Sequence, residues 1–327
     1  ASGALDQAMG DEGQTRYVMV DWKMVTPGSK FGAPSQFNPN VSRSDFFELA
    51  YPRVEGQRGF GRPLQLRTQR YYDSQMVRLY AYHGSAVNPR PIVVNAQQET
   101  VNAQGQQLQI QAYDQETGIQ KFDTLRAARA YIEENPTAQL GGIGKNPTER
   151  VSALEQYRLV HAGGQPVLRY GQYQQNLVRN QRQANVSVGE QIFTIPSWVK
   201  TFEKVPGATV DGSGAPAGAE VAATVRMEVP STGRTFSYTQ YATADENGNF
   251  EMTLPYSTTG YENFGPENGY TNVSVQATGQ YRFAASQQAV GSAEVSEAQV
   301  VGVDDSPVQV ALSQPTRTSR QSVQATG

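Results

Sequence analysis

The sequence predicts an α+β protein in which a mixed α/β core unit is followed by an all-β sandwich. Two observations lead to this prediction. In the first half, apolar residues occur both in short runs and at the three- and four-residue spacing of helices. After Val210, four segments alternate apolar and polar residues with a period of two and are separated by clusters of turn residues. The change of pattern falls near Trp198 and separates the two parts.

The chain has 327 residues, more than one average domain, so two or three compact units are expected. Shifts in composition indicate where these units meet. The expected organisation is a mixed α/β core at 1–90, an α+β continuation or insertion at 91–170, a polar linker or exposed excursion at 171–195, a β-sandwich at 196–312 and a disordered tail at 313–327.

The first unit combines a strand with a later helix. The apolar run from Tyr17 to Asp21 predicts a short buried strand that leads into a loop rich in Pro and Gly. Residues Tyr71 to Gly84 predict a helix. On it, Asp73 and Met76 are three residues apart, so their side chains would emerge on one face. That pair can line a peptide-sized groove, but the pattern equally fits a core helix on which Asp73 is solvated or capping.

The second unit begins with strand patterns and then becomes helical. Asp123 is the expected N-cap of this helix, and Asn135 followed by Pro136 is expected to end it, because proline restrains the residue before it. Residues 171–190 are rich in Gln, Asn and Arg and contain few large apolar side chains. This composition is typical of a linker or of an exposed excursion.

The C-terminal part has the turn chemistry of an all-β unit. Asn247-Gly248 is the strongest hairpin signal in the chain. Asp245 and its neighbours also imitate the first ligands of a calcium loop, but Phe250 stands where such a loop requires glycine, so an ordinary turn is preferred. The segment from Val210 resembles the small prealbumin-like sandwiches found on many surface proteins, which usually buttress a neighbouring domain.

Composition excludes several classes of function. Cysteine is absent and only His83 and His161 are present, which argues against thiolate metal sites, disulfides and a Ser-His-Asp triad. A net charge of −3 gives no support for binding nucleic acid. No apolar run is long enough to span a bilayer, and no signal peptide begins the chain, so the chain alone is expected to be soluble.

Several segments together resemble the C-terminal extracytoplasmic domain of the archaeal oligosaccharyltransferase family AglB, in its haloarchaeal form. They occur in the same order as in the family and cover most of the chain. These segments are Tyr17–Pro34, Tyr71–Gly84, Ala127–Gly144, Glu149–Val160, Trp198–Pro216 and Leu254–Gly279. The family transfers a lipid-linked glycan to the Asn of Asn-X-Ser/Thr acceptors.

The resemblance also implies site residues. The family's WWDYG motif is missing, because neither Trp22 nor Trp198 lies in such a sequence. The second acceptor motif has Asp followed by Lys or Met three positions later and a further apolar residue after four more. Asp73 and Met76 match it, whereas Tyr80 stands where Met or Ile is usual. The expected acceptor-peptide pocket is therefore Asp73, Met76 and Tyr80, with no catalytic residue in this chain.

The resemblance implies cofactors and partners as well. In the family a divalent metal, Mn or Mg, is held chiefly by carboxylates of membrane-domain loops, so no metal site is expected in this chain and the isolated chain should be inactive. Expected partners are an acceptor polypeptide, the parent's own transmembrane domain and its lipid-linked oligosaccharide. The expected location is the extracytoplasmic face of the archaeal cell membrane.

Three Asn-Val-Ser sequons are candidate glycosylation sites in that setting, at Asn40, Asn185 and Asn272. Asn185 lies in the polar stretch and is expected to be the most exposed.

Two other functions fit parts of the sequence. A free-standing secreted or cell-surface binding module with an immunoglobulin- or prealbumin-like sandwich would use the 17 tyrosines for recognition, since Tyr combines an apolar face with a hydroxyl. A hydrolase built on Glu133 and Glu134 is disfavoured, because adjacent helix positions do not face each other.

Overall fold

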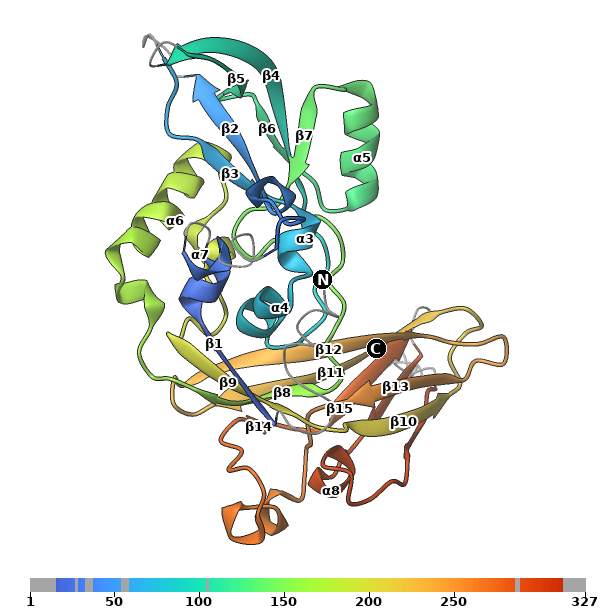
Figure 1. Cartoon of the computed structure of the whole chain (residues 1–327). Coiled ribbons are helices and arrows are strands. Elements are labelled where there is room, and N and C mark those ends of the chain that lie inside the picture. The colour runs from blue at the N-terminus through green and yellow to red at the C-terminus, as the bar shows by residue number, and fades with distance from the viewer. Residues whose placement is uncertain are drawn as a thin grey trace, which may run out of the picture.

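The computed structural model describes residues 16–26, 29–32, 38–53, 59–103, 106–285 and 289–313. Within these ranges, a six-stranded sheet lies at one end of the molecule and a β-sandwich at the other, with two short helices between them (Figure 1). The fold is α+β, as the sequence predicts. The expected tail beyond Ser313 and most of the predicted Pro/Gly loop near Pro27 lie outside the described residues.

The six-stranded sheet forms the end that carries α5. Its strands are β2 (Phe47–Arg53), β3 (Leu64–Arg67), β4 (Ile92–Ala103), β5 (Gln106–Asp114), β6 (Ile119–Lys121) and β7 (Ala138–Gly141). The order is β3-β2-β5-β4-β6, and β7 also pairs with β4. Helix α5 (Leu125–Glu134) begins after Thr124, whose side chain accepts from the Ala127 N–H, so the expected N-cap is off by one residue.

A three-stranded sheet connects the two ends of the molecule. It consists of β1 (Tyr17–Asp21), β9 (Val199–Lys204) and β8 (Tyr157–Ala162), in the order β1-β9-β8. These strands come from three of the expected units, so the sheet crosses the boundaries that composition suggests. The prediction that β1 is a buried strand is wrong. Only Val20 is buried in it, because β1 is an edge strand with one open face.

The polar stretch after residue 170 is folded, which corrects the expectation of a linker. It contains α6 (Gly171–Ala184) and α7 (Val188–Gln191). Leu177 and Ala184 are buried and lie seven positions apart, so a narrow apolar stripe of α6 faces the protein. The Gln191 side-chain amide donates to the carbonyl oxygens of Leu177 and Val186, at 3.0 and 2.9 Å. Sequence composition did not reveal a stripe this narrow.

The sandwich is formed by two sheets. Its elements are β10 (Ala208–Ser213), β11 (Glu220–Val229), β12 (Arg234–Thr243), β13 (Phe250–Leu254), β14 (Gln276–Ala277), β15 (Tyr281–Ala285), β16 (Val290–Ala293), α8 (Glu297–Val300) and β17 (Val308–Ala311). One sheet has the order β13-β10-β17, and the other β12-β11-β15-β16 with β14 beside β11. Alternation along β11 and β12 places every second residue in the interior, which confirms the predicted sandwich.

The turn at Asn247-Gly248 does not close a hairpin. It joins β12 to β13, which belong to different sheets. The Asp245 carboxylate accepts from the backbone N–H groups of Asn247 and Asn249, at 2.8 and 2.7 Å, and Gly248 adopts a φ of 79°. The sequence signal for a tight turn was correct, but the sandwich topology decides which strands pair.

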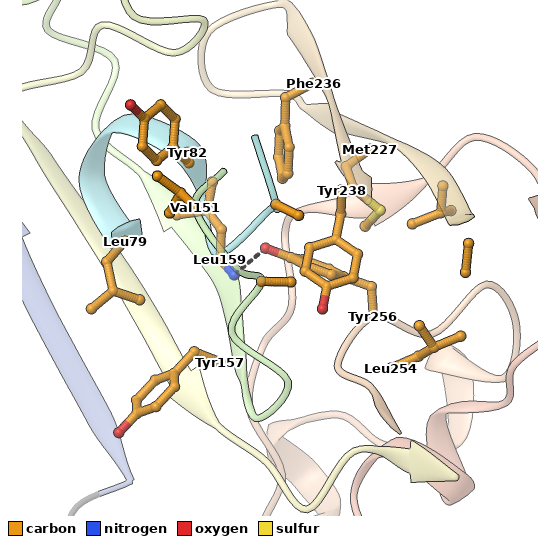
Figure 2. Close-up of a cluster of buried hydrophobic side chains, with 14 of the residues drawn as sticks. Leu79, Tyr82, Val151, Tyr157, Leu159, Met227, Phe236, Tyr238, Leu254 and Tyr256 are labelled. Carbon is orange, nitrogen blue, oxygen red and sulfur yellow. Dashed lines mark hydrogen bonds between the residues drawn. The ribbon is translucent and has the colours of Figure 1, made fainter. Parts of the chain in front are cut away.

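One large cluster of buried side chains runs through the middle of the molecule. Figure 2 shows Leu79 and Tyr82 near Leu159 and the sandwich residues Tyr238 and Tyr256. The Tyr256 hydroxyl accepts from the Leu159 N–H at 2.8 Å. Short 3-10 helices lie at Trp22–Val25, Lys30–Gly32, Arg43–Asp45, Val167–Arg169, Tyr261–Asn263 and Pro266–Asn268. No helix in the described part of the chain is long and apolar enough to cross a membrane.

Candidate functional site

The predicted helix at residues 71–84 is interrupted at Asp73. Helix α3 covers Gln69–Tyr72 and α4 covers Gln75–Tyr82. Ser74 is extended, with φ −63° and ψ 136°, and its hydroxyl donates to the Tyr71 carbonyl at 2.7 Å. Serine competes for backbone hydrogen bonds in this way and favours helix ends. Asp73 is thus the C-cap of α3, and Met76 lies in the first turn of α4.

Asp73 is exposed at the surface, and a hydrogen bond from a neighbouring side chain fixes the orientation of its carboxylate. Its Oδ1 accepts from the Gln69 side-chain amide at 2.9 Å. The Gln69 oxygen accepts in turn from the Thr148 hydroxyl and the Glu149 N–H, at 2.8 and 2.7 Å. Partial burial raises the pKa of Asp73, and the Gln69 hydrogen bond opposes this change. The carboxylate is therefore fixed in direction while its face remains open to solvent.

Met76 and Tyr80 differ in how deeply their side chains are buried. Met76 is partly buried and packs against the large core cluster. Tyr80, one turn further along α4, is fully buried, and its hydroxyl donates to the Ser197 carbonyl. Asp73 is thus exposed at the end of α3 and Met76 is partly buried at the start of α4, whereas Tyr80 lies fully inside the protein.

A buried lysine lies behind α4, and the sequence patterns did not indicate it. Lys200 of β9 has no exposed area, and its Nζ donates to the Tyr80 carbonyl at 2.5 Å. The same nitrogen lies 3.0 Å from His83 Nε2 and 4.0 Å from the centre of the Tyr80 ring. Burial holds the pKa of Lys200 well below its ordinary value, and burial together with Lys200 does the same for the pKa of His83.

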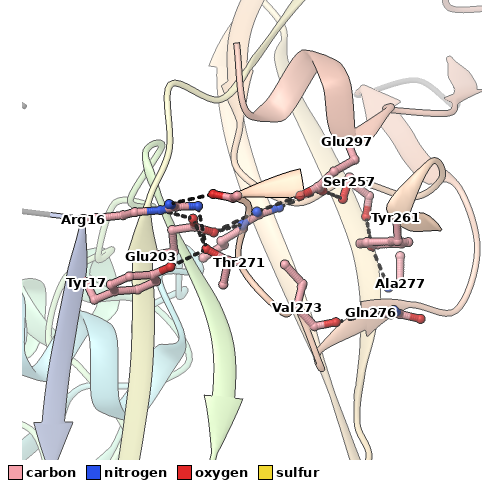
Figure 3. Close-up of polar contacts among 12 residues, drawn as sticks. Arg16, Tyr17, Glu203, Ser257, Tyr261, Thr271, Val273, Gln276, Ala277 and Glu297 are labelled. Carbon is pink, nitrogen blue, oxygen red and sulfur yellow. Dashed lines mark hydrogen bonds and ion pairs between the residues drawn. The ribbon is translucent and has the colours of Figure 1, made fainter. Parts of the chain in front are cut away.

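A second polar cluster joins β8 and β9 to the sandwich. Arg158 is 1% exposed and donates to both Glu203 and Glu297, with N–O distances of 2.7 to 3.0 Å. Figure 3 shows that Glu203 also accepts from Arg16 and Thr271, and that Glu297 accepts from Ser257. Each buried charge is paired and hydrogen bonded, as such groups require.

The alternation of inward and outward residues along β9 could have indicated its buried charged side chains. In β9, Lys200 alternates with Thr201 and lies on the same face as Phe202, which is fully buried. A charged residue at an inward position of a strand needs a partner. The partner's identity depends on strands and helices far away in sequence, so sequence alone did not name it.

The candidate glycosylation residues all lie on the surface. Asn40, Asn185 and Asn272 are exposed, and Asn185 caps α6 in the left-handed conformation with φ 48°. The serine of each sequon has a structural contact. Ser187 caps α7, Ser274 donates to the Val160 carbonyl, and Ser42 lies beside the Ser44 hydroxyl. No group of three or more metal-ligating His, Asp or Glu side chains occurs among the described residues.

Comparison with known proteins identifies the family. The family described as the archaeal glycosylation protein B long peripheral domain matches residues 207–304, a span that begins immediately before β10. The dolichyl-monophosphooligosaccharide–protein glycotransferase AglB of Haloferax volcanii is 46% identical over 322 residues, which is 93% of this chain. Residues 207–304 belong to this family, and the similarity to AglB extends over 93% of the chain. The chain spans 30% of the length of that AglB relative.

Solved structures agree at the level of the fold. The Archaeoglobus fulgidus oligosaccharyltransferase in complex with Zn and sulfate has a TM-score of 0.54 and 16% identity, covering 95% of this chain and 35% of that protein chain. The same enzyme tethered to an acceptor peptide containing an NVT sequon has a TM-score of 0.54, again at 16% identity, and covers 95% of this chain and 32% of that one. This chain and that part of the Archaeoglobus enzyme therefore share a fold despite their low sequence identity.

Proposed function

We propose that this chain is the extracytoplasmic part of an archaeal oligosaccharyltransferase and helps hold the acceptor polypeptide. The complete enzyme would transfer a lipid-linked glycan to the Asn of Asn-X-Ser/Thr sequons. The similarity to a glycotransferase over 93% of the chain supports this role. The acceptor-peptide complex of the Archaeoglobus enzyme, which has the same fold, supports a peptide as the partner.

The residues that carry the proposal are Asp73, which is exposed at the surface, and Met76, which is partly buried three positions later in the first turn of α4. A thioether chain can adapt its shape to a small apolar group such as the methyl of a sequon threonine. The Asp73 carboxylate is fixed by Gln69 and can accept a hydrogen bond from peptide N–H or hydroxyl groups. Tyr80 takes no part in the contact itself, since it is fully buried.

The chain contributes binding, and the chemistry of transfer belongs to the rest of the enzyme. A divalent cation, Mn or Mg, would supply Lewis-acid assistance there. Among the described residues, no cluster of three or more His, Asp or Glu side chains is placed to hold such an ion. The remaining partners are the parent's transmembrane domain and its lipid-linked oligosaccharide, and the location is the extracytoplasmic face of the membrane. Asn40, Asn185 and Asn272 are candidate acceptors on the chain itself.

Cross-linking in the full-length enzyme tests the contact. The variant Met76→p-benzoylphenylalanine should label a sequon peptide on irradiation, and excess unlabelled peptide should suppress the label. Val178→p-benzoylphenylalanine is the control, since Val178 is also an apolar residue of a surface helix and lies on α6. Equal labelling from both positions would contradict the proposed contact.

An activity measurement tests whether glycan transfer requires the rest of the enzyme. The purified chain, given lipid-linked oligosaccharide, divalent metal and a sequon peptide, should yield no glycopeptide by mass spectrometry, while the full-length enzyme should yield it. Metal-dependent product from the isolated chain would place the chemistry in this chain.

A further inference from the structure

A cavity of about 190 Å³ lies between the six-stranded sheet and the segment that connects α6 to α7. Its lining includes neither Asp73 nor Met76. The lining residues come from the start of β4, the end of β6 and the residues after it, the loop after β7, and the segment that runs from Val186 into α7. The residues that matter for its chemistry are Arg90, Lys121, Phe122, Asn146 and Glu190.

The inner wall of this cavity is apolar. Ile92 and Val186 are 2% and 1% exposed and contribute to the lining. Phe122 is partly buried, and its ring lies 5.5 Å from that of Tyr131, which holds it in place. A flat ring with one apolar face can pack against such a wall.

The rim carries two cationic side chains, Arg90 and Lys121, and their charges help to lower the pKa of the Glu190 carboxyl group on the same rim. The Arg90 guanidinium forms no hydrogen bond or ion pair with any residue that the structure describes. Within the described ranges, Lys121 Nζ donates a hydrogen bond to the backbone carbonyl of Asn185. Lys145 lies close by, and burial and then Arg90 lower its pKa. A negatively charged ligand group can pair with the Arg90 guanidinium, which has no such partner among the described residues.

The same cavity contains acceptors that favour hydroxyl groups. Glu190 uses Oε2 to accept from the Ser187 N–H at 2.8 Å, which leaves Oε1 for a ligand. Hydrogen bonds from Ser187 lower the pKa of Glu190, so this group is a carboxylate at neutral pH. Asp123 adds a second carboxyl group, and Asn146 is 8% exposed with an amide that can both donate and accept. Two carboxylates repel a compact dianion such as phosphate more strongly than they repel a ligand with a single negative charge.

We propose that this cavity binds a sugar acid, meaning a polyhydroxylated ring that carries a single carboxylate. The ring packs on Ile92, Val186 and Phe122. Its carboxylate pairs with Arg90, and its hydroxyls donate to Glu190 and Asn146. The proposal does not depend on the acceptor-peptide role, because the two sites share no residue.

Titration calorimetry of the purified chain with glucuronate, glucose and inorganic phosphate tests this inference. Glucuronate should bind about tenfold or more tightly than glucose, as expected for a hydrogen-bonded charge pair. Phosphate should bind less tightly than glucuronate. Arg90→Gln should abolish the preference for glucuronate over glucose, whereas Arg226→Gln, which changes an exposed arginine of β11, should not. Thermal melts of both variants verify that they are folded.

Three outcomes would overturn the proposal. One is that calorimetry detects no heat of binding for any of the three ligands. Another is equal affinity for phosphate and glucuronate, which would describe a simple anion site. The third is an unchanged preference for glucuronate in Arg90→Gln, which would place the ligand elsewhere.

Discussion

Lys200 shows how a single residue departs from the usual rule for buried charge. Lysine is almost never fully buried unless it is paired, yet its partners here are the Tyr80 carbonyl, the His83 ring and the Tyr80 ring. No ion pair joins Lys200 to a carboxylate of the described residues. The neutral amine is therefore favoured in the folded protein, and the same environment favours neutral His83.

This arrangement predicts a pH dependence of stability. The unfolded chain protonates lysine below about pH 10.5, whereas the folded state binds that proton only at much lower pH. The unfolded state thus holds more protons between the two pKa values, and stability rises with pH across this window. His83 contributes with the same sign below about pH 6.5.

The variant Lys200→Met should flatten the pH dependence of urea unfolding between about pH 7 and pH 9. Lys204→Met serves as the control, because Lys204 is exposed on the same strand, and it should leave the slope unchanged. A slope in Lys200→Met that equals the wild-type slope would show that Lys200 keeps its charge in the fold.

Met76 gives the second residue-scale prediction. If it contacts the acceptor peptide, Met76→Ala in the full-length enzyme should weaken peptide use by about 1–2 kcal/mol, the value for a partly buried apolar contact. Val178→Ala should have no effect. A core role would instead cost about 2–5 kcal/mol of stability and leave peptide affinity unchanged. Acceptor kinetics of the enzyme and thermal melts of the chain distinguish the two.

At the scale of elements, the Arg158 cluster joins β8, β9 and α8. Replacing Arg158 by Met leaves Glu203 and Glu297 buried without their shared partner. The loss should be about 3–5 kcal/mol in urea unfolding, as for other broken buried pairs. Arg226→Met, at an exposed position of β11, should change stability by no more than about 0.5 kcal/mol.

A combined variant separates the charge effect from packing. Adding Glu203→Gln and Glu297→Gln to Arg158→Met removes the uncompensated charges and should restore part of the lost stability. No recovery would mean that Arg158 acts mainly by filling space between β8 and the sandwich.

At the scale of the whole molecule, one core and one shared sheet join parts that composition separates. Strand β9 pairs with β1 on one side and β8 on the other, and the buried cluster continues into the sandwich. We therefore expect one cooperative transition for the chain in scanning calorimetry. Two well-separated transitions would show that the sandwich unfolds independently of the mixed unit. The family match from residue 207 supports a sandwich boundary immediately before β10.

Local patterns were sufficient where a segment's own residues decide its structure. Strand Tyr17–Asp21 has the predicted bounds, and α5 begins within two residues of the expected N-cap Asp123. The sandwich could be predicted because a strand with one buried face alternates apolar and polar residues with a period of two. Pattern reasoning failed at residues 171–184, where two buried side chains on a polar helix left almost no signal.

The sequence alone determined the α+β class and the sandwich. It also carried the resemblance to AglB, because long segments occur in the family's order. Only the tertiary structure decided that α3 and α4 are separate, that β1 is an edge strand and that Tyr80 is buried. It alone paired Lys200 with His83 and Arg158 with Glu297, which lie 117 and 139 residues apart. The physical reason is that burial and charge pairing depend on which distant segments meet, and a single sequence does not contain that information in local form.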